Sequence, residues 1–104
     1  MSTTIDVIVK GIDYSSQKCV FRTVVLKSDL SLLSQMQQEY TKYVIKWNFD
    51  LGGNMLDVPV GCILVFDGGQ LSNGAIHWND TKVLNQYRYE ILKNITESGD
   101  KIEL

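Results

Sequence analysis

The side chains with reactive or metal-binding groups are few in this chain and lie far apart in the sequence. Its one histidine, His77, stands beside Trp78, and such a pair either stacks on a sugar ring or serves as ordinary packing. No serine or carboxylate accompanies His77 at the spacing of a catalytic motif, so we expect no general base. Cys19 and Cys62 stand alone in different segments, which is not the spacing of zinc ligands. The sequence therefore predicts no enzyme activity, no metal and no cofactor.

The two cysteines bear on the cellular compartment instead. The first residues, MSTTIDVIVKG, contain neither a basic segment nor a long apolar run, so we expect no secretory signal peptide. Without a sign of secretion, free thiols at Cys19 and Cys62 are favoured over a disulfide between them.

Composition argues against two classes of partner. The formal net charge is −2 and the ten basic residues form no run, so the chain lacks the electrostatic footprint of a nucleic-acid-binding protein. No window approaches 18 consecutive apolar residues, and we expect no membrane-spanning segment. With 104 residues, 44% of them hydrophobic and 21% charged, the chain has the composition of one folded domain.

The N-terminal half shows the patterns of strands and one helix. Residues 4–10 alternate between apolar and polar, and residues 19–27 are rich in β-branched side chains, which together predict a β-hairpin. Ser28-Asp29 is a good helix N-cap, and apolar residues at 30, 33, 36 and 40 predict a helix that ends near residues 40–42. Strict alternation over residues 43–51 predicts one strand about 30 Å long.

The C-terminal half shows a short buried strand, a series of turns and a second helix. Residues 62–67 are apolar almost without interruption, which predicts cover on both faces of that strand. In residues 84–98 apolar side chains recur at helical spacing from Leu84 onward, which predicts an amphipathic helix. The residues expected to form structural turns are glycines: Gly52, Gly53, Gly61, Gly68, Gly69 and Gly74.

These elements predict a mixed fold of the α+β class, mainly β with two helices. It consists of an N-terminal ββα segment at residues 1–44, a Gly-cornered β region at 45–84, and a C-terminal helix and tail at 85–104. We expect the three segments to form one compact unit. The patterns do not decide whether the N-terminal hairpin joins the main sheet.

The middle of the chain resembles a known family. The matching motifs are D-L-G-G-N at residues 50–54, V-P-V-G-C at 58–62 and G-G-Q-L-S-N-G-A-I at 68–76. They are similar to the opening coils of right-handed parallel β-helix proteins of the pectin-lyase-like kind. Such openings occur in proteins of gut Bacteroides and in the fibres and spikes of their phages, crAss-like phages included.

The resemblance implies a short β-solenoid-like region of at most two coils, whose ends something else must cover. Family members that cut polysaccharide place acidic and basic residues on a later sheet. Asp57, Asp67 and Asp80 match no such arrangement, so the resemblance implies no catalytic residue here.

The resemblance and the lack of a reactive cluster favour a structural role. We expect a virion component, a head or tail fibre subunit, that forms a homo-oligomer with a trimer favoured and docks to other virion or fibre proteins. It would be assembled in the cytoplasm of the bacterial host. The alternative is a carbohydrate-binding or adhesin module that contacts a host glycan through Trp47 or Trp78, and a polysaccharide-lyase fragment ranks last. The residues expected at the oligomer or partner interface are aromatic or aliphatic: Trp47, Phe49, Leu64, Phe66, Leu71, Ile76, Trp78, Tyr87 and Tyr89.

Overall fold

The computed structural model describes residues 22–104, and its main feature is a set of β-strands that wind in coils. The pairings between these strands are all parallel. The strand predicted at 4–10 and Cys19 lie outside the described residues. In chain order the elements are β1 (Arg22–Val25), α2 (Leu32–Gln35), β2 (Thr41–Ile45), β3 (Phe49–Asp50), β4 (Met55–Asp57), β5 (Ile63–Phe66), β6 (Leu71–Asn85) and β7 (Leu92–Glu103).

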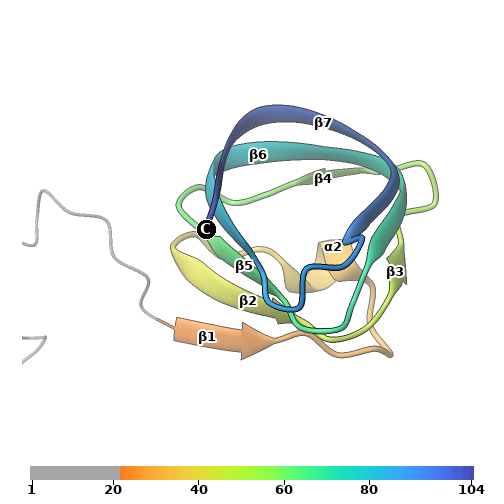
Figure 1. Ribbon diagram of the computed structural model, residues 1–104, viewed down its shortest axis with the longest axis horizontal. Helices are drawn as coiled ribbons and strands as arrows, with labels where there is room; N and C mark the ends of the chain where they lie inside the picture. Colours follow the sequence, from red (N-terminus) through yellow and green to blue (C-terminus); the bar gives the residue numbers. More distant parts are fainter. Residues whose placement is uncertain (1–21) are drawn as a thin grey trace, which may run out of the picture.

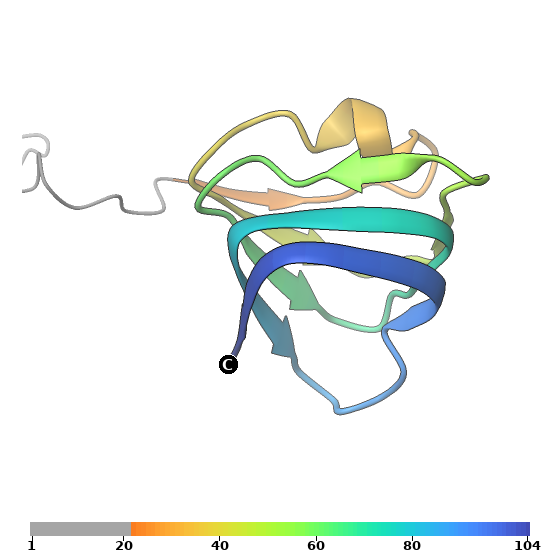
Figure 2. The same cartoon turned by 90° about the horizontal axis from the view of Figure 1, so that it is seen from above.

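The coils have three sides and a roughly triangular outline (Figure 1). The first side stacks β1, β2, β5, the end of β6 and the end of β7, in that order. On the second side β3 pairs with the start of β6, and on the third side β4 pairs with the middle of β6. β7 follows β6 around all three sides. Successive coils therefore lie one below another, as Figure 2 shows.

Each coil uses nearly the same length of chain. On the first side Lys42, Ile63, Lys82 and Ile102 occupy successive paired positions, which are 21, 19 and 20 residues apart. Backbone hydrogen bonds hold parallel strands together, so the coils need no repeated sequence. The coils extend from β1 to β7, well beyond residues 45–84, and the expectation of at most two coils is wrong.

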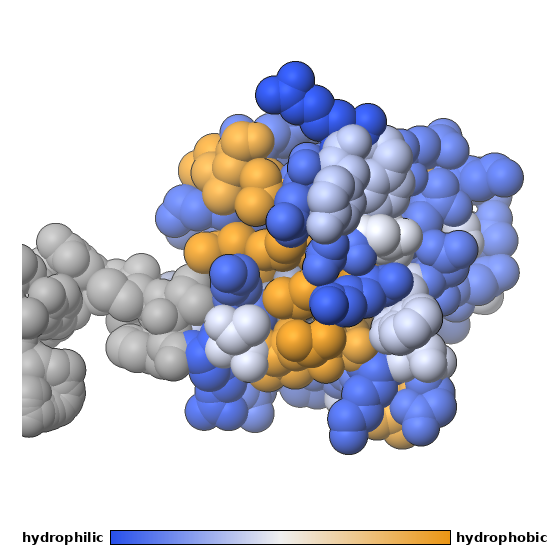
Figure 3. Space-filling view, turned by 60° about the horizontal axis from the view of Figure 1, so that its bottom comes forward, coloured by the Kyte–Doolittle hydropathy of each residue, from blue (hydrophilic) through white to orange (hydrophobic). Residues whose placement is uncertain are grey.

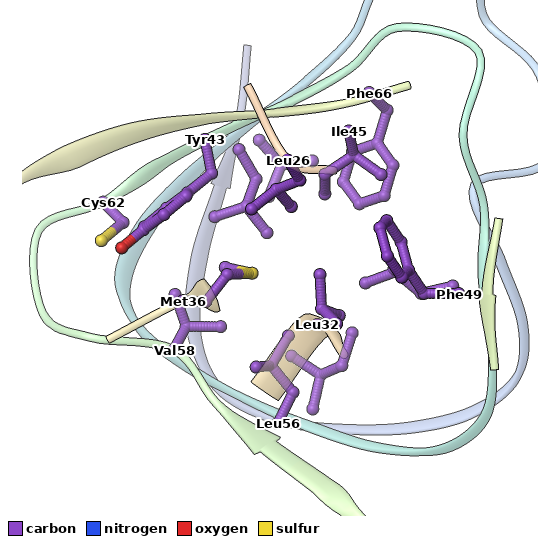
Figure 4. Close-up of a cluster of buried hydrophobic side chains, with 14 of the residues drawn as sticks. Leu26, Leu32, Met36, Tyr43, Ile45, Phe49, Leu56, Val58, Cys62 and Phe66 are labelled. Atoms are coloured by element: carbon purple, nitrogen blue, oxygen red, sulfur yellow. The ribbon is translucent and has the colours of Figure 1, made fainter. Parts of the chain in front are cut away.

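The hydrophobic core is the inside of the coil. Alternate residues of each strand point inward, and those of successive coils stack in rows such as Tyr43, Leu64 and Val83. A second row joins Ile45 to Phe66. These five side chains are all buried, and the labelled members converge on one interior in Figure 4. Removal of this apolar surface from water is the main term that stabilises the fold.

The first predicted helix is wrong except for a single turn, α2. The Ser31 hydroxyl caps its N-terminus, and the N–H of Met36 makes the last helical hydrogen bond, 3.1 Å from the Leu32 carbonyl oxygen. Beyond this turn the N–H of Gln38 donates to the Tyr43 hydroxyl at 3.0 Å, which directs the chain toward β2. Leu32 and Met36 point into the interior of the coil (Figure 4).

The second predicted helix, at residues 84–98, is also wrong. β6 continues to Asn85, a loop follows, and β7 begins at Leu92. Arg88 and Asn94 have φ angles of 56° and 57°, which a right-handed helix does not accept. Pairing with β6 satisfies the backbone groups along one edge of β7 and places Leu92 beside Leu71; this non-local pairing outweighs a weak local helical preference. The fold is therefore mainly β rather than α+β with two helices.

The long strand predicted at residues 43–51 is bent into two. β2 ends at Ile45, residues 46–48 turn a corner, and β3 begins at Phe49. Ile45 and Phe49 both point inward and are buried, because three corner residues preserve the alternation between inward and outward side chains. Alternation alone therefore does not distinguish a straight strand from a bent one.

Candidate functional site: an assembly surface outside the coil

Four aliphatic side chains form a row on the outside of the first side. The residues on either side of Val44 are buried in the interior, so Val44 itself points outward. The same alternation directs Val25, Val65 and Leu84 outward. Strand pairing brings the four into register, with Val25 beside Val44, Val44 beside Val65, and Val65 beside Leu84. We call these four residues the outer aliphatic row.

The outer aliphatic row is partly open to solvent. Val25 is 51% exposed, Val44 and Leu84 are half-buried, and Val65, which has an aliphatic neighbour on each side, is 6% exposed. Val65 does not belong to the interior cluster. Figure 3 turns the lower face of the molecule forward and shows apolar side chains gathered on it. Contiguous apolar surface of this kind marks interaction sites on folded proteins.

Charged side chains border the row on both sides. In the next outward row upstream, Lys42 and Lys82 flank Ile63. Downstream, the Lys46 ammonium lies 3.7 Å from a carboxylate oxygen of Asp67. This exposed pair contributes little stability by itself. An apolar centre with a charged rim is the usual anatomy of a protein–protein interface.

The nine residues predicted at the interface fall into two groups. The first group is buried inside the chain's own coil, where a partner does not reach: Phe49, Leu64, Phe66, Leu71, Ile76 and Trp78. The second group lies on the outside, where Trp47 is 49% exposed and Tyr87 is 62% exposed. Tyr89 is half-buried, and its hydroxyl accepts from the Gly68 N–H at 2.9 Å and donates to the Gly69 carbonyl. Tyr89 thereby fastens the loop before β7 to a corner of the previous coil.

The outer aliphatic row is absent from that predicted set, although part of its signal lies in the sequence. The nearly continuous apolar run at 62–67 predicted cover on both faces of the strand, and Val65 lies on its outer face. Recognition of the whole row requires the register, which brings Val25 and Leu84 to the same side from distant parts of the chain.

The predicted turn glycines serve two purposes. Four of them have φ in the left-handed region that glycine accepts at least cost: Gly52, Gly53, Gly61 and Gly68. Gly69 is needed for a different reason, since a Cβ atom there would collide with the Trp47 carbonyl and lie 2.7 Å from the Ile45 side chain. At Gly74 a Cβ atom would lie 2.5 Å from the Asn54 carbonyl oxygen. These last two glycines allow neighbouring coils to approach each other closely.

The structure gives His77 two polar neighbours that its sequence spacing concealed. On the outside of the third side Asp57 pairs with His77, and His77 pairs with Ser98. The His77 Nδ1 atom lies 3.0 Å from the Ser98 hydroxyl. These are the residue types of an acyl-transfer triad, but they lie on an open strand surface that does not enclose a substrate. We interpret the Ser98–His77 contact as a cross-strand pair that stabilises the sheet.

Three inward positions of the last coil carry charges. Glu97, Lys101 and Glu103 pair with buried residues of the preceding coil. The Lys101 ammonium lies 2.8 Å from Glu97 and 3.1 Å from Glu103. The Trp78 indole N–H donates to Glu97 at 3.0 Å, and the Lys101 ammonium lies 5.3 Å from the Trp78 ring centroid. We call Glu97, Lys101 and Glu103 the end cluster.

The contacts of the end cluster shift two pKa values. The hydrogen bond from Lys101 lowers the pKa of Glu97, assisted by the Trp78 N–H and opposed by partial burial. Partial burial lowers the pKa of Lys101, but hydrogen bonds and charges from Glu97 and Glu103 raise it by more, so that the net change is upward. Both shifts favour the charged forms at neutral pH.

Other kinds of site find little support in the described part of the chain. Residues 22–104 contain no group of three or more His, Cys, Asp or Glu placed to hold a metal ion. Cys62 is a free, buried thiol whose pKa is raised by burial. No helix within the same residues has the length and apolar character needed to cross a membrane. Comparisons with protein-family models, with curated proteins and with solved structures found no match.

Proposed function

We propose that this protein is a structural subunit that assembles with copies of itself through the outer aliphatic row. The observation that carries the proposal is the alignment of Val25, Val44, Val65 and Leu84 across four successive coils. Covering such a row removes apolar surface from water, which contributes roughly 25 cal/mol per Å². The row lies outside the coil, so the chain's own core does not bury it.

A second copy is the partner that fits this surface. Side chains of similar size repeat along the row at the spacing of neighbouring strands, about 4.8 Å. The same row on another copy has the same spacing, and an interface of this kind is self-complementary. Lys42 and Lys82 on one border, and the Lys46–Asp67 pair on the other, would remain hydrated at the rim.

The setting that we propose comes from the sequence resemblance. Opening coils of this type occur in phage fibres and spikes, which favours a virion component assembled in the host cytoplasm and docked to other virion or fibre proteins. The trimer favoured by the sequence stays a prediction.

The mass of the full chain in solution tests the assembly. Light scattering and native mass spectrometry from micromolar to millimolar concentration should give a multiple of the 11.8 kDa monomer. Three times that mass would support the trimer and twice that mass a dimer. A protein that stays folded and monomeric over the whole range would contradict the proposal.

A charge in the outer aliphatic row tests which surface is used. Val44→Glu and Leu84→Glu should each weaken association at least about tenfold, because the carboxylate would be desolvated in the interface. Thr96→Glu is the matched control, since Thr96 is exposed and belongs to the third side. If Thr96→Glu weakens association equally, added charge alone is responsible and the row is not the interface.

One observation favours carbohydrate binding as a second candidate function. Trp47 is 49% exposed at the corner between β2 and β3, where its ring is available to stack on a sugar. Trp78, the other tryptophan considered for this role, is 2% exposed and does not form a platform. Binding to a glycan array that is lost in Trp47→Ala and kept in Tyr87→Ala would establish this function.

A further inference from the structure

The last strand, β7, leaves a long edge open. Over residues 92–103 it pairs with β6 on one side, and the described residues supply no strand for its other side. An open strand edge of this length is a template for pairing with another chain. Beside this edge the end of the coil is hollowed, with a volume of ≈ 480 Å³ bordered by Val83, Leu92 and the end cluster.

Two of the inward rows change from apolar to charged side chains where they reach β7. The row that contains Val83 is apolar through the preceding coils and ends at Glu103. The row that contains Ile76 ends at Glu97 in the same way, and the third charge, Lys101, lies between them on the strand. The end of the coil is therefore ionic at Glu97 and Glu103, where the preceding coil is apolar, and at Lys101, which follows the buried Thr81.

This arrangement opposes the addition of a further strand. The end cluster contains two carboxylates and one ammonium group, so a strand stacked on it would bury one negative charge without a partner. When two copies meet by the same edge, the contact is two-fold symmetric. Each copy would then present the same net negative cluster to the other, and like charges would be brought together.

We propose that the end cluster prevents the free edge of β7 from pairing with the β7 edge of a second copy. We call this two-fold symmetric contact tail-to-tail pairing. The end cluster lies at the end of the coil, whereas the outer aliphatic row lies along its side. Association through the end of the coil is thereby disfavoured. The inference does not depend on the proposed function, because the two surfaces are separate.

The test replaces the charged side chains of the end cluster with uncharged side chains of similar size. The triple variant Glu97→Gln, Lys101→Met, Glu103→Leu keeps an acceptor for the Trp78 N–H and supplies apolar side chains below Thr81 and Val83. We expect its mass at least to double relative to the unmodified chain at the same concentration. We also expect amide exchange in β7 to slow at least about tenfold, since tail-to-tail pairing protects that edge.

A matched control makes the same change of charge on the outside of the coil. Asp57→Asn, Lys93→Met, Asp100→Leu alters three exposed side chains and should leave the mass unchanged. The inference is overturned if the folded end-cluster variant keeps the parent mass, if the control assembles equally, or if β7 amides stay unprotected in the assembled variant. Should the triple variant not fold, Glu103→Gln is measured, which leaves the neutral Glu97–Lys101 pair; a smaller rise in mass is expected, and an unchanged mass would contradict the inference. A monomeric unmodified chain would contradict the proposed function and leave this inference standing.

Discussion

The two ends of the coil carry side chains of opposite kinds, apolar at one end and charged at the other. At the N-terminal end α2 lays Leu32 and Met36 over the interior, where they are 3% and 2% exposed, and Figure 2 shows the helix at that end. At the other end Glu97, Lys101 and Glu103 occupy inward positions. The buried side chains of Leu32 and Met36 add to the core, whereas the partly exposed end cluster contributes little stability. The comparison shows that apolar packing covers one end of the coil, whereas the other end carries charges that are costly to bury.

The largest effect on stability is expected at the end of the coil that α2 covers. Leu32→Ala should lower the free energy of unfolding by about 2–5 kcal/mol, because it removes a buried side chain and leaves a cavity under α2. Leu30→Ala is the control; Leu30 is 49% exposed, and its loss should cost less than about 0.5 kcal/mol. Urea unfolding measures both values. Equal effects would show that α2 does not close the coil.

A smaller difference between a variant and its control is expected where the last coil touches the one before it. Gly99 and Gly53 have similar φ angles, 86° and 83°, but a Cβ atom at Gly99 would collide with the Trp78 carbonyl while one at Gly53 meets open space. Gly53→Ala should cost about 1–2 kcal/mol from backbone strain alone. Gly99→Ala should cost about 1–3 kcal/mol more, because the coils must separate. Urea unfolding that gives the same loss for both would show that the last coil is not closely packed.

The smallest effect is expected from the charged end, and it depends on pH. The pKa of Glu97 is lowered mainly by Lys101, so its contribution to stability is present above its ordinary pKa of 4.5 and is lost as pH falls through the lower folded value. The difference in melting temperature between the unmodified chain and Glu97→Gln should therefore be small near pH 7 and disappear in acid. A difference that grows on acidification would contradict the assigned direction of the shift.

The sequence predicted local alternation well and continuous elements poorly. The alternation at 43–51 correctly placed Tyr43 and Phe49 on one face, and both are in the core. It did not reveal the corner at 46–48, because a bent path preserves the same alternation. The helix predicted at 84–98 failed because apolar residues at helical spacing need not share one face of a helix: Leu84 points outward from β6, whereas Leu92 packs against the core from β7.

The candidate site was less predictable than the core. Val65 was implied by a strand apolar on both faces, but its alignment with Val25 and Leu84 was not. The end cluster was hidden for the same reason, since nothing near Glu97 in the sequence indicates that it follows Ile76 in an inward row.

By itself the sequence determined which side chains alternate and where glycine permits a corner, because both depend on neighbouring residues alone. Only the tertiary structure decided which residues meet between coils. Paired residues on the first side are 19 to 21 positions apart, and their register depends on the length of every corner between them. A register shift between Trp78 and Thr81 absorbs a difference of one residue between β6 and β7; without such an irregularity, a change of one residue at a corner would exchange the inward and outward faces of the next strand. The outer aliphatic row and the end cluster therefore exist only in the folded chain.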